Sequence, residues 1–354
     1  MKNIYLKILE LQHAGHQLVL ATVAGSIGST PQKPGSSALF DGSRLIAGTV
    51  GGGMVEARVQ NLAQTKRQTK ESCYLKIQLN NNISDKEAAI CGGEISVLMD
   101  ANPEKWLPVF EEIKESMAER IPGILITMVT VLGEDKIIVD RYWMTNMKKP
   151  SLDFRYLNRI EPEVKNILAA ADPENFKQMK IALPGKKQLT LFLLEPIFPL
   201  PQLYIAGAGH IGKALSHLGK MLDFEVTIID DRQEYANSDN LPDADHVIVQ
   251  DIGEAVEKIE KKHDTFIVIV TRGHNDDAKA LKPCIGSDAG YVGMIGSKGK
   301  VAKMHAEFIQ QGWAGEEQWN RIYTPIGLEI RSKTVEEIAI SIAAQLVQVR
   351  NRKR

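Results

Sequence analysis

Three glycines at fixed spacing give the clearest chemical signal of the chain. Gly207, Gly209 and Gly212 form a GxGxxG pattern between a short apolar segment and an amphipathic one. In this pattern the first glycine allows a tight turn, the second lets backbone approach a diphosphate, and the third lets a helix pack closely on a strand. The helix that follows offers unpaired N–H groups to an anion. We therefore predict a phosphate-binding turn, in which His210 is either a ligand contact or a helix-capping residue.

An acidic pair stands where such a turn needs one. Asp230 and Asp231 follow the apolar segment 226–229, about 20 residues beyond the glycines. A carboxylate at that place accepts hydrogen bonds from the hydroxyls of a ribose. The glycines, the helix and the acid lie in a strand–helix–strand context, which favours a nucleotide-type Rossmann unit over a chance glycine turn.

Two further loops should reach the same edge of the sheet, because ligands of open parallel sheets bind outside the carboxyl ends of the strands. The first loop holds His274, which is a candidate acid/base catalyst or half of a metal site, or belongs to a helix cap. We interpret its neighbours Asn275 and Asp276 as capping residues. In the second loop, Gly296 and Lys298 resemble an anion cradle, although a glycine turn followed by lysine is also common on surfaces.

Glycines also precede a helix in the N-terminal half. Gly51, Gly52 and Gly53 can bring backbone N–H groups against an anion. Glu56, in the first turn of that helix, is equally well explained by its favourable interaction with the helix dipole. Cys91 precedes two glycines, whose backbone dipoles could make the thiol reactive, although a lone cysteine is more often a small packed apolar residue.

Composition excludes several classes of protein. A formal net charge of −1 with 25% charged residues gives no positive field for nucleic acid. No apolar run reaches the ~18 residues that a membrane span needs. The three cysteines are too far apart for a disulfide framework or a Cys-based zinc site, so we expect a reducing cytoplasm. We assign no residue of the chain as a metal ligand.

The order of predicted elements indicates an α/β protein with two domains. Residues 1–198 read as an N-terminal α+β domain, with a subdivision near 100, and the proline-rich segment 196–201 marks its end. Residues 199–354 alternate strands with helices, which predicts a Rossmann-type parallel sheet. The last helix begins with a capping box, Thr334 and Glu337, and its apolar stripe is either core or a dimer seam, with core favoured. The N-terminal half has predicted helices at 4–14, 54–68, 104–119 and 162–171 and predicted strands at 18–24, 38–40, 45–50, 95–99, 124–131, 136–143 and 188–194; the C-terminal strands are at 203–206, 225–229, 246–249, 266–270 and 290–295.

Two regions together resemble one known family. GSTPQKPGSSALFDGSRLIAGTVGGGMVEARV and CGGEISVLMDANP resemble the N-terminal domain of the XdhC/CoxI family. GAGHIG, IIDDR, TRGHNDD, YVGMIGSKGK and TPIGLEI resemble the Rossmann domain of that family. The resemblance covers residues 10–100 and 200–350 in the family's order, and leaves 105–195 unspecified. Arg331 departs from it, because the family pattern leads us to expect a small residue there.

The resemblance implies an accessory protein of molybdenum hydroxylases such as xanthine dehydrogenase. Such a chaperone binds molybdenum cofactor (molybdopterin), assists its sulfuration by a cysteine desulfurase, and delivers it to the apo-enzyme without itself being a hydroxylase. Carried onto this chain, the crevice would use the GxGxxG glycines and His210, with Gly51, Gly52 and Gly53 facing it from the other domain. Cys91 becomes a candidate sulfur or cofactor contact, and Cys91 and His274 are the catalytic candidates.

Two other functions compete with this one. An NAD-dependent oxidoreductase would use the Rossmann domain, with Asp230 and Asp231 selecting an unphosphorylated ribose. A nucleotide-sensing module would bind without turnover. NAD is thus a further candidate ligand. Separately, we expect the chain to form a homodimer.

Overall fold

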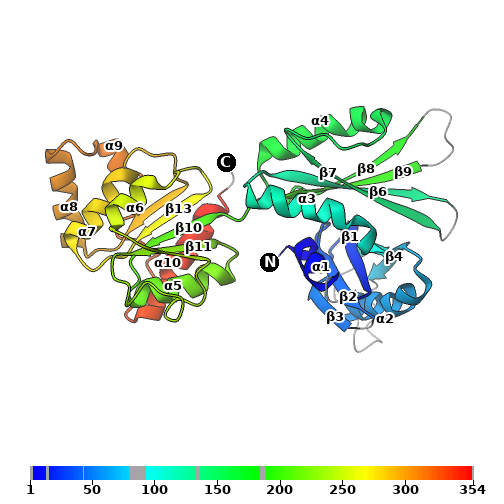
Figure 1. Cartoon of the computed structure of the whole chain (residues 1–354), viewed down its shortest axis with the longest axis horizontal. Helices are drawn as coiled ribbons and strands as arrows, with labels where there is room; N and C mark the ends of the chain where they lie inside the picture. The colour runs from blue at the N-terminus through cyan, green and yellow to red at the C-terminus, as the bar shows by residue number, and fades with distance from the viewer. Residues whose placement is uncertain are drawn as a thin grey trace. The chain divides into compact units, whose positions relative to one another are not determined.

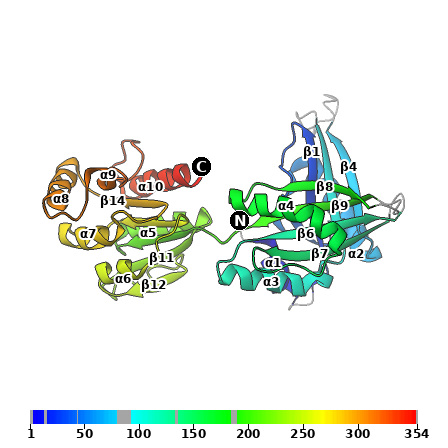
Figure 2. The same ribbon diagram turned by 90° about the horizontal axis from the view of Figure 1, so that it is seen from above.

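The computed structural model describes residues 3–12, 16–42, 44–79, 93–132, 136–183 and 189–352. The chain divides into two compact units, which we call unit 1 (Met1–Pro199) and unit 2 (Leu200–Arg354). Figures 1 and 2 show the elements of each unit from two directions. Cys91, together with the rest of 80–92, lies outside the described residues.

Unit 1 contains two antiparallel sheets. Sheet A has the strand order β3-β2-β1-β5-β4, and sheet B has the order β7-β6-β9-β8. The predicted turn at Gly42, whose φ is +61°, separates β2 from β3 and is confirmed. The strands of sheet A are β1 (Leu18–Gly28), β2 (Ser37–Asp41), β3 (Arg44–Gly48), β4 (Cys73–Leu79) and β5 (Gly93–Asp100); those of sheet B are β6 (Gly123–Val131), β7 (Ile137–Thr145), β8 (Lys177–Ala182) and β9 (Leu189–Ile197).

The alternation of side chains along β1 explains how unit 1 is layered. Val19, Ala21 and Val23 pack against α2 on one face of sheet A, and Leu18 and Leu20 pack on the other face against α1, α3 and sheet B. Helix α4 covers the remaining face of sheet B. The helical segments of unit 1 are α1 (Ile4–Gln12), α2 (Gly53–Thr69), the 3-10 helix η1 (Pro103–Trp106), α3 (Leu107–Ala118) and α4 (Phe154–Ala170).

Unit 2 is built on one parallel sheet, sheet C, in the order β12-β11-β10-β13-β14. This confirms the predicted Rossmann-type domain. Its strands are β10 (Gln202–Ala206), β11 (Glu225–Asp230), β12 (His246–Val249), β13 (Thr265–Ile269) and β14 (Tyr291–Met294); its helical segments are α5 (His210–Met221), α6 (Ile252–Lys258), α7 (His274–Leu281), η2 (Lys282–Cys284), α8 (Lys298–Gln310), α9 (Glu316–Trp319) and α10 (Val335–Arg350).

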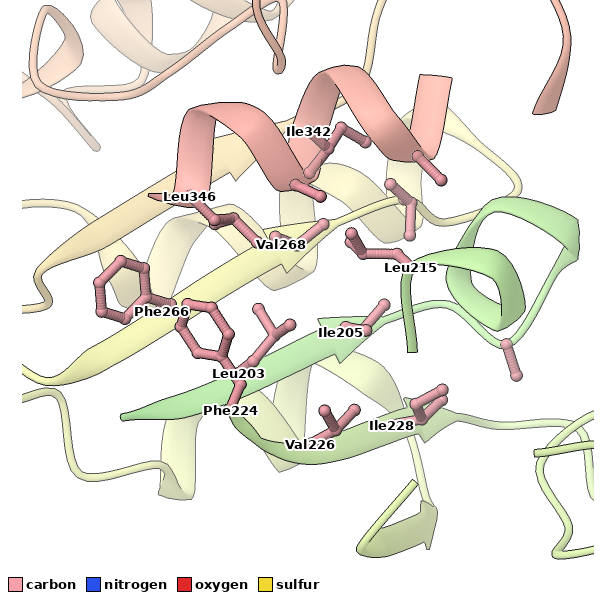
Figure 3. Close-up of a cluster of buried hydrophobic side chains, with 14 of the residues drawn as sticks. Leu203, Ile205, Leu215, Phe224, Val226, Ile228, Phe266, Val268, Ile342 and Leu346 are labelled. Atoms are coloured by element: carbon pink, nitrogen blue, oxygen red, sulfur yellow. The ribbon is translucent and has the colours of Figure 1, made fainter. Parts of the chain in front are cut away.

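Helices cover both faces of sheet C. Helices α5 and α10 pack on one face and α6, α7, α8 and α9 on the other. Figure 3 shows Ile342 and Leu346 of α10 above Val268 and Phe266, and both are fully buried. The apolar stripe of α10 therefore belongs to the core, as favoured from the sequence, and its capping box is confirmed. The homodimer stays a prediction.

Several elements differ from the sequence-based expectation. Strands β4 and β8 were not predicted, and α4 begins eight residues before Pro162, which lies inside the helix. The helix continues through the proline because Tyr156, Ile160 and Val164 keep one buried face. Strand β9 includes Pro196, which the sequence placed in the domain boundary.

The departure at Arg331 has a conformational explanation. Its φ is +60°, in the left-handed region that glycine adopts most readily. Glycine at this position would avoid the steric penalty that the Cβ of arginine carries.

Candidate functional site

The edge of sheet C where β10 and β13 end holds most of the predicted site residues of unit 2. Strands β10, β11 and β12 fill one half of the sheet, and β13 and β14 fill the other. Helix α5, which follows β10, packs on one face, whereas α7, which follows β13, packs on the opposite face. The two loops therefore diverge, and this divergence is the switch point at which open α/β sheets bind ligands. We call the residues 207–212 and 271–274 the switch-point loops.

The three glycines of the first switch-point loop have different roles. Gly207 has a φ of +121°, and a Cβ there would lie 2.5 Å from the Val270 carbonyl oxygen, so the turn and the close approach of the second loop both need glycine. A Cβ on Gly212 would overlap the Gly207 carbonyl oxygen. A Cβ on Gly209 would meet no atom within 4 Å among the described residues. Sterically, Gly209 is free to admit an outside group.

Two helices begin at the switch point with glycine caps. Gly209 is the N-cap of α5 and Gly273 is the N-cap of α7, and in the described part of the chain no side chain caps either helix. A Cβ on Gly273 would also meet open space. The first N–H groups of a helix lack intrahelical partners and carry partial positive charge. Two adjacent strands thus lead into two helix N-termini that can receive an anion.

The third loop at this edge follows β14. Ser297 caps α8, because its hydroxyl accepts a hydrogen bond from the Lys300 N–H at 3.3 Å. Lys298 is exposed in the first turn and Gly296 lies just before the cap. The predicted cradle is therefore a capped helix start with an exposed ammonium group beside the switch-point loops.

Asp230 holds the first switch-point loop in place through its hydrogen bonds. Its side chain is buried and accepts hydrogen bonds from the Ala208 N–H at 2.8 Å and from Arg232 Nε at 2.9 Å. Burial alone would raise the pKa of this carboxyl, but the hydrogen bonds from Arg232 and from the Ala208 backbone hold it below its ordinary value. A ligand contact would have to displace Arg232. The neighbouring carboxylate, Asp231, is exposed and lies 2.8 Å from Arg272 Nη2 of the second loop.

A buried acid supports the second switch-point loop. Asp277 is fully buried, accepts a hydrogen bond from Thr271 Oγ1 at 2.5 Å, and forms an ion pair with Lys300 of α8. Burial raises the pKa of Asp277 and outweighs the opposing effects of Lys300 and Thr271. This cluster ties the loop after β13 to the helix after β14.

The structure places His274 and corrects our interpretation of its neighbours. Nε2 of His274 lies 2.9 Å from Glu307 Oε2 of α8, and the ring is partly exposed. Asn275 and Asp276 do not cap α7, because the cap is Gly273 and both residues lie within the first turn. His210, the first residue of α5, is exposed at the first loop.

The predicted anion cradle of unit 1 is built entirely from positive-φ glycines. Gly51, Gly52 and Gly53 have φ values of +133°, +64° and +47°, and Gly52 is the N-cap of α2. Glu56 accepts a hydrogen bond from Thr49 Oγ1 at 2.8 Å, so it braces the turn besides favouring the helix dipole. Thr49 was not predicted; it also accepts a hydrogen bond from the Gly51 N–H at 3.1 Å.

Sequence reasoning did not find the ion-pair partners of the basic residues that support the unit 2 loops. Arg232 and Arg272 stand inside motifs that were singled out, yet their partners Asp230 and Asp231 are set by how the loops fold back. Lys300 stands two residues beyond the predicted Lys298, and only the packing of α8 brings it to Asp277.

The described residues contain neither a cluster of metal-ligating side chains nor a membrane-spanning helix. Within them, no three His, Cys, Asp or Glu side chains are grouped so as to hold a metal ion. Among the helices in the same part of the chain, none has the length and apolarity needed to cross a bilayer.

Comparisons with known proteins place both units in one family. Residues 203–346 match the XdhC Rossmann domain, and residues 11–77 match the XdhC and CoxI family. The chain is 23% identical to a probable xanthine dehydrogenase subunit of Bacillus subtilis, over 99% of both chains. A crystal structure of a xanthine dehydrogenase from Bacillus halodurans has the same fold, with a TM-score of 0.77 at 23% identity, covering 99% of this chain and 97% of that one.

A further relative matches only part of the chain. The uncharacterized protein YqeB of Escherichia coli is 32% identical over 152 residues, which are 43% of this chain and 28% of the E. coli protein. The match thus spans little more than a quarter of that protein. The two family models fall in separate units and match in the order that the sequence motifs indicated, so the chain belongs to the XdhC and CoxI family.

Proposed function

We propose that this chain is an accessory protein of a xanthine-dehydrogenase-type molybdenum hydroxylase. It binds molybdenum cofactor as cargo, holds it for sulfuration by a cysteine desulfurase, and passes it to the apo-enzyme. Membership of the XdhC and CoxI family and the full-length similarity to the B. subtilis protein support the association with such an enzyme.

The observation that best supports cargo binding is the pair of open helix N-termini at the switch point. Molybdopterin carries a phosphate, which suits N–H groups that have no intrahelical partner. Gly209 and Gly273 leave free the volume that a side chain would fill, so the phosphate can approach the backbone directly. The geometry of the site therefore fits the cargo's anionic end.

Side chains around the switch-point loops would orient the rest of the cargo. His210 and Lys298 are exposed at the two flanking helix starts and can donate hydrogen bonds to it. His274 is held by Glu307, so its ring is positioned before any ligand arrives. The chain itself carries out no covalent step in this proposal, because the desulfurase supplies the sulfur; a contact from Cys91 belongs to the same proposal and depends on residues outside the described part.

A titration of the purified chain with molybdopterin tests the site. Gly209→Val should weaken binding at least about tenfold, which corresponds to about 1.4 kcal/mol, because its side chain would occupy the phosphate position. Gly315→Val is the matched control: Gly315 is also an N-cap in extended backbone, and its Cβ would make only one ordinary contact, 3.7 Å from Gln318 Oε1. Gly315 follows α8, whose 13 residues place its C-terminal end about 20 Å from its start. Equal affinity in the two variants would remove the switch point from the model.

A second experiment tests the accessory role separately from the site. The hydroxylase is produced with and without this chain, and its sulfuration and activity are compared. We expect an under-sulfurated, weakly active enzyme in the absence of the chain. Fully sulfurated, active enzyme made without it would contradict the proposal.

The NAD-dependent oxidoreductase is tested in the same titration. The strand order of sheet C suits a dinucleotide, but the buried Asp230 that would hold its ribose is occupied by Arg232 and the Ala208 N–H. NAD is therefore expected to bind weakly. Tight NAD binding without molybdopterin binding would favour the oxidoreductase.

A further inference from the structure

A cavity of about 360 Å³ opens in unit 1, and none of its lining residues belongs to the switch-point loops. It lies among the end of α2, the start of β4, the end of β5, the 3-10 helix η1 and the start of β7. Its volume falls within the range of small-molecule sites, about 300–1,000 Å³. We propose that this cavity binds a small organic anion with a flat apolar body, and we call it the lysine cavity.

Three lysines from separate elements converge on the lysine cavity. Lys70 is the C-cap of α2, Lys105 belongs to η1, and Lys136 immediately precedes β7. Lys70 Nζ lies 3.3 Å from Glu104 Oε1 and forms an ion pair with it. Lys105 and Lys136 are exposed and form no ion pair with another residue of the described ranges. Within the described part of the chain, these two ammonium groups are available to a ligand of opposite charge.

The charge of Asp100, a buried acid that lines the cavity, is balanced by Arg141. Asp100 and Arg141 are both buried, and Arg141 Nη2 lies 3.3 Å from Asp100 Oδ2. The other carboxylate oxygen, Oδ1, accepts hydrogen bonds from the Asn102 N–H at 3.0 Å and from Ser72 Oγ at 3.4 Å. Because the ion pair and the hydrogen bonds compensate its charge, Asp100 repels an anion less than an unpaired carboxylate would.

Two further acids of the described residues, Glu71 and Asp140, lie on or next to the lining of the cavity. Glu71 is exposed at the rim, where solvent screens it. Asp140 is next to Val139, a cavity-lining residue, and its charge interacts with that of Lys105. Burial raises the pKa of Asp140 and outweighs the opposing charge of Lys105.

One wall of the cavity is apolar. Trp106 contributes its indole ring, and residues 137–139 contribute the edge of β7. An aromatic ring that is half-buried beside cations suits a flat ligand, which can stack on the indole while its charge faces the lysines. This combination selects an anion with an apolar body over inorganic phosphate or a neutral ring.

Fluorine NMR of the full chain labelled with 5-fluorotryptophan tests the proposal. The chain has four tryptophans, and Trp106→Phe identifies the resonance of interest. Phenyl phosphate should shift the Trp106 resonance in a saturable way, and inorganic phosphate or benzyl alcohol should act only at much higher concentration. A Trp106 resonance that phenyl phosphate does not move, or that benzyl alcohol moves equally well, would overturn the proposal.

Charge variants decide whether the lysines hold the ligand. Lys105→Gln with Lys136→Gln should weaken the phenyl phosphate response about tenfold. Lys114→Gln with Lys165→Gln, which removes two exposed lysines of the same unit, should leave it unchanged. Gly209→Val should also leave it unchanged, which separates this cavity from phosphate binding at the switch point. An equal response in the two lysine pairs would contradict the assignment.

Discussion

At the scale of single residues, the glycines of the first switch-point loop separate folding from binding. Gly207 and Gly212 are needed because backbone atoms lie where a Cβ would stand, whereas Gly209 faces open space. The same motif thus contains two positions whose substitution damages the fold and one whose substitution should affect only the ligand.

We expect Gly212→Ala to destabilise unit 2 by about 1–3 kcal/mol, because the added methyl group overlaps the Gly207 carbonyl oxygen. Denaturant unfolding followed by circular dichroism measures the change. Gly299→Ala, in helix α8 with no atom of the described chain within 4 Å of its Cβ, should be neutral or slightly stabilising. Similar losses in both variants would show that the overlap is relieved at little cost.

Glu195 should make unit 1 less stable as the pH rises. Its carboxylate accepts a hydrogen bond from Tyr5 Oη at 2.6 Å, and burial raises its pKa from 4.5 to about 7 against the opposing effects of Tyr5 and Arg141. The folded state therefore binds this proton more tightly than the unfolded state. Its contribution to stability is fully present below pH 4.5 and is lost as the pH rises to about 7.

We expect Glu195→Gln to remove this pH dependence. The variant should gain stability over the natural chain between about pH 5 and about pH 8, by up to about 3 kcal/mol. Unfolding free energies measured at several pH values test it. Glu174→Gln, at an exposed acid of the same unit, should show no such trend. A difference between Glu195→Gln and the natural chain that does not change with pH would contradict the raised pKa.

At the scale of elements, the local patterns were predicted better than the edge strands. The glycine spacing, the hairpin at Gly42 and the capping box of α10 depend on neighbours in sequence, and all three are confirmed. Strands β4 and β8 were missed because lysine and glutamine interrupt their apolar residues, in the sequences CYLKIQL and KQMKIA. The pairs Asp230–Arg232 and Asp277–Lys300 depend on tertiary folding, which the sequence pattern does not contain.

The packing of α10 gives an element-scale prediction. Leu346→Ala should destabilise unit 2 by about 2–4 kcal/mol, because the side chain is fully buried against sheet C. Ile340→Ala on the same helix, where the side chain is 52% exposed, should change stability by less than about 0.5 kcal/mol. Thermal unfolding compares the two. Equal losses of stability in the two variants would mean that Leu346 does not lie on the buried face of α10.

At the scale of the whole molecule, the two units have separate cores. Every hydrophobic cluster found among the described residues lies entirely within one unit. A domain with its own core can fold alone. We therefore expect residues 200–354, produced by themselves, to unfold cooperatively and to keep the molybdopterin affinity of the switch point; a fragment without a cooperative transition would show that unit 2 needs unit 1.

The hydrogen bond from the Ala208 N–H to Asp230 has a consequence for the timing of a handover. Because Arg232 fixes the same carboxylate, the first switch-point loop is held in its shape by the chain's own side chains. Little conformational entropy is then lost on capture, and no loop has to open on release. Under the proposed function, the lifetime of the loaded state would be set by the contacts themselves, and a recipient enzyme would shorten it by competing for them.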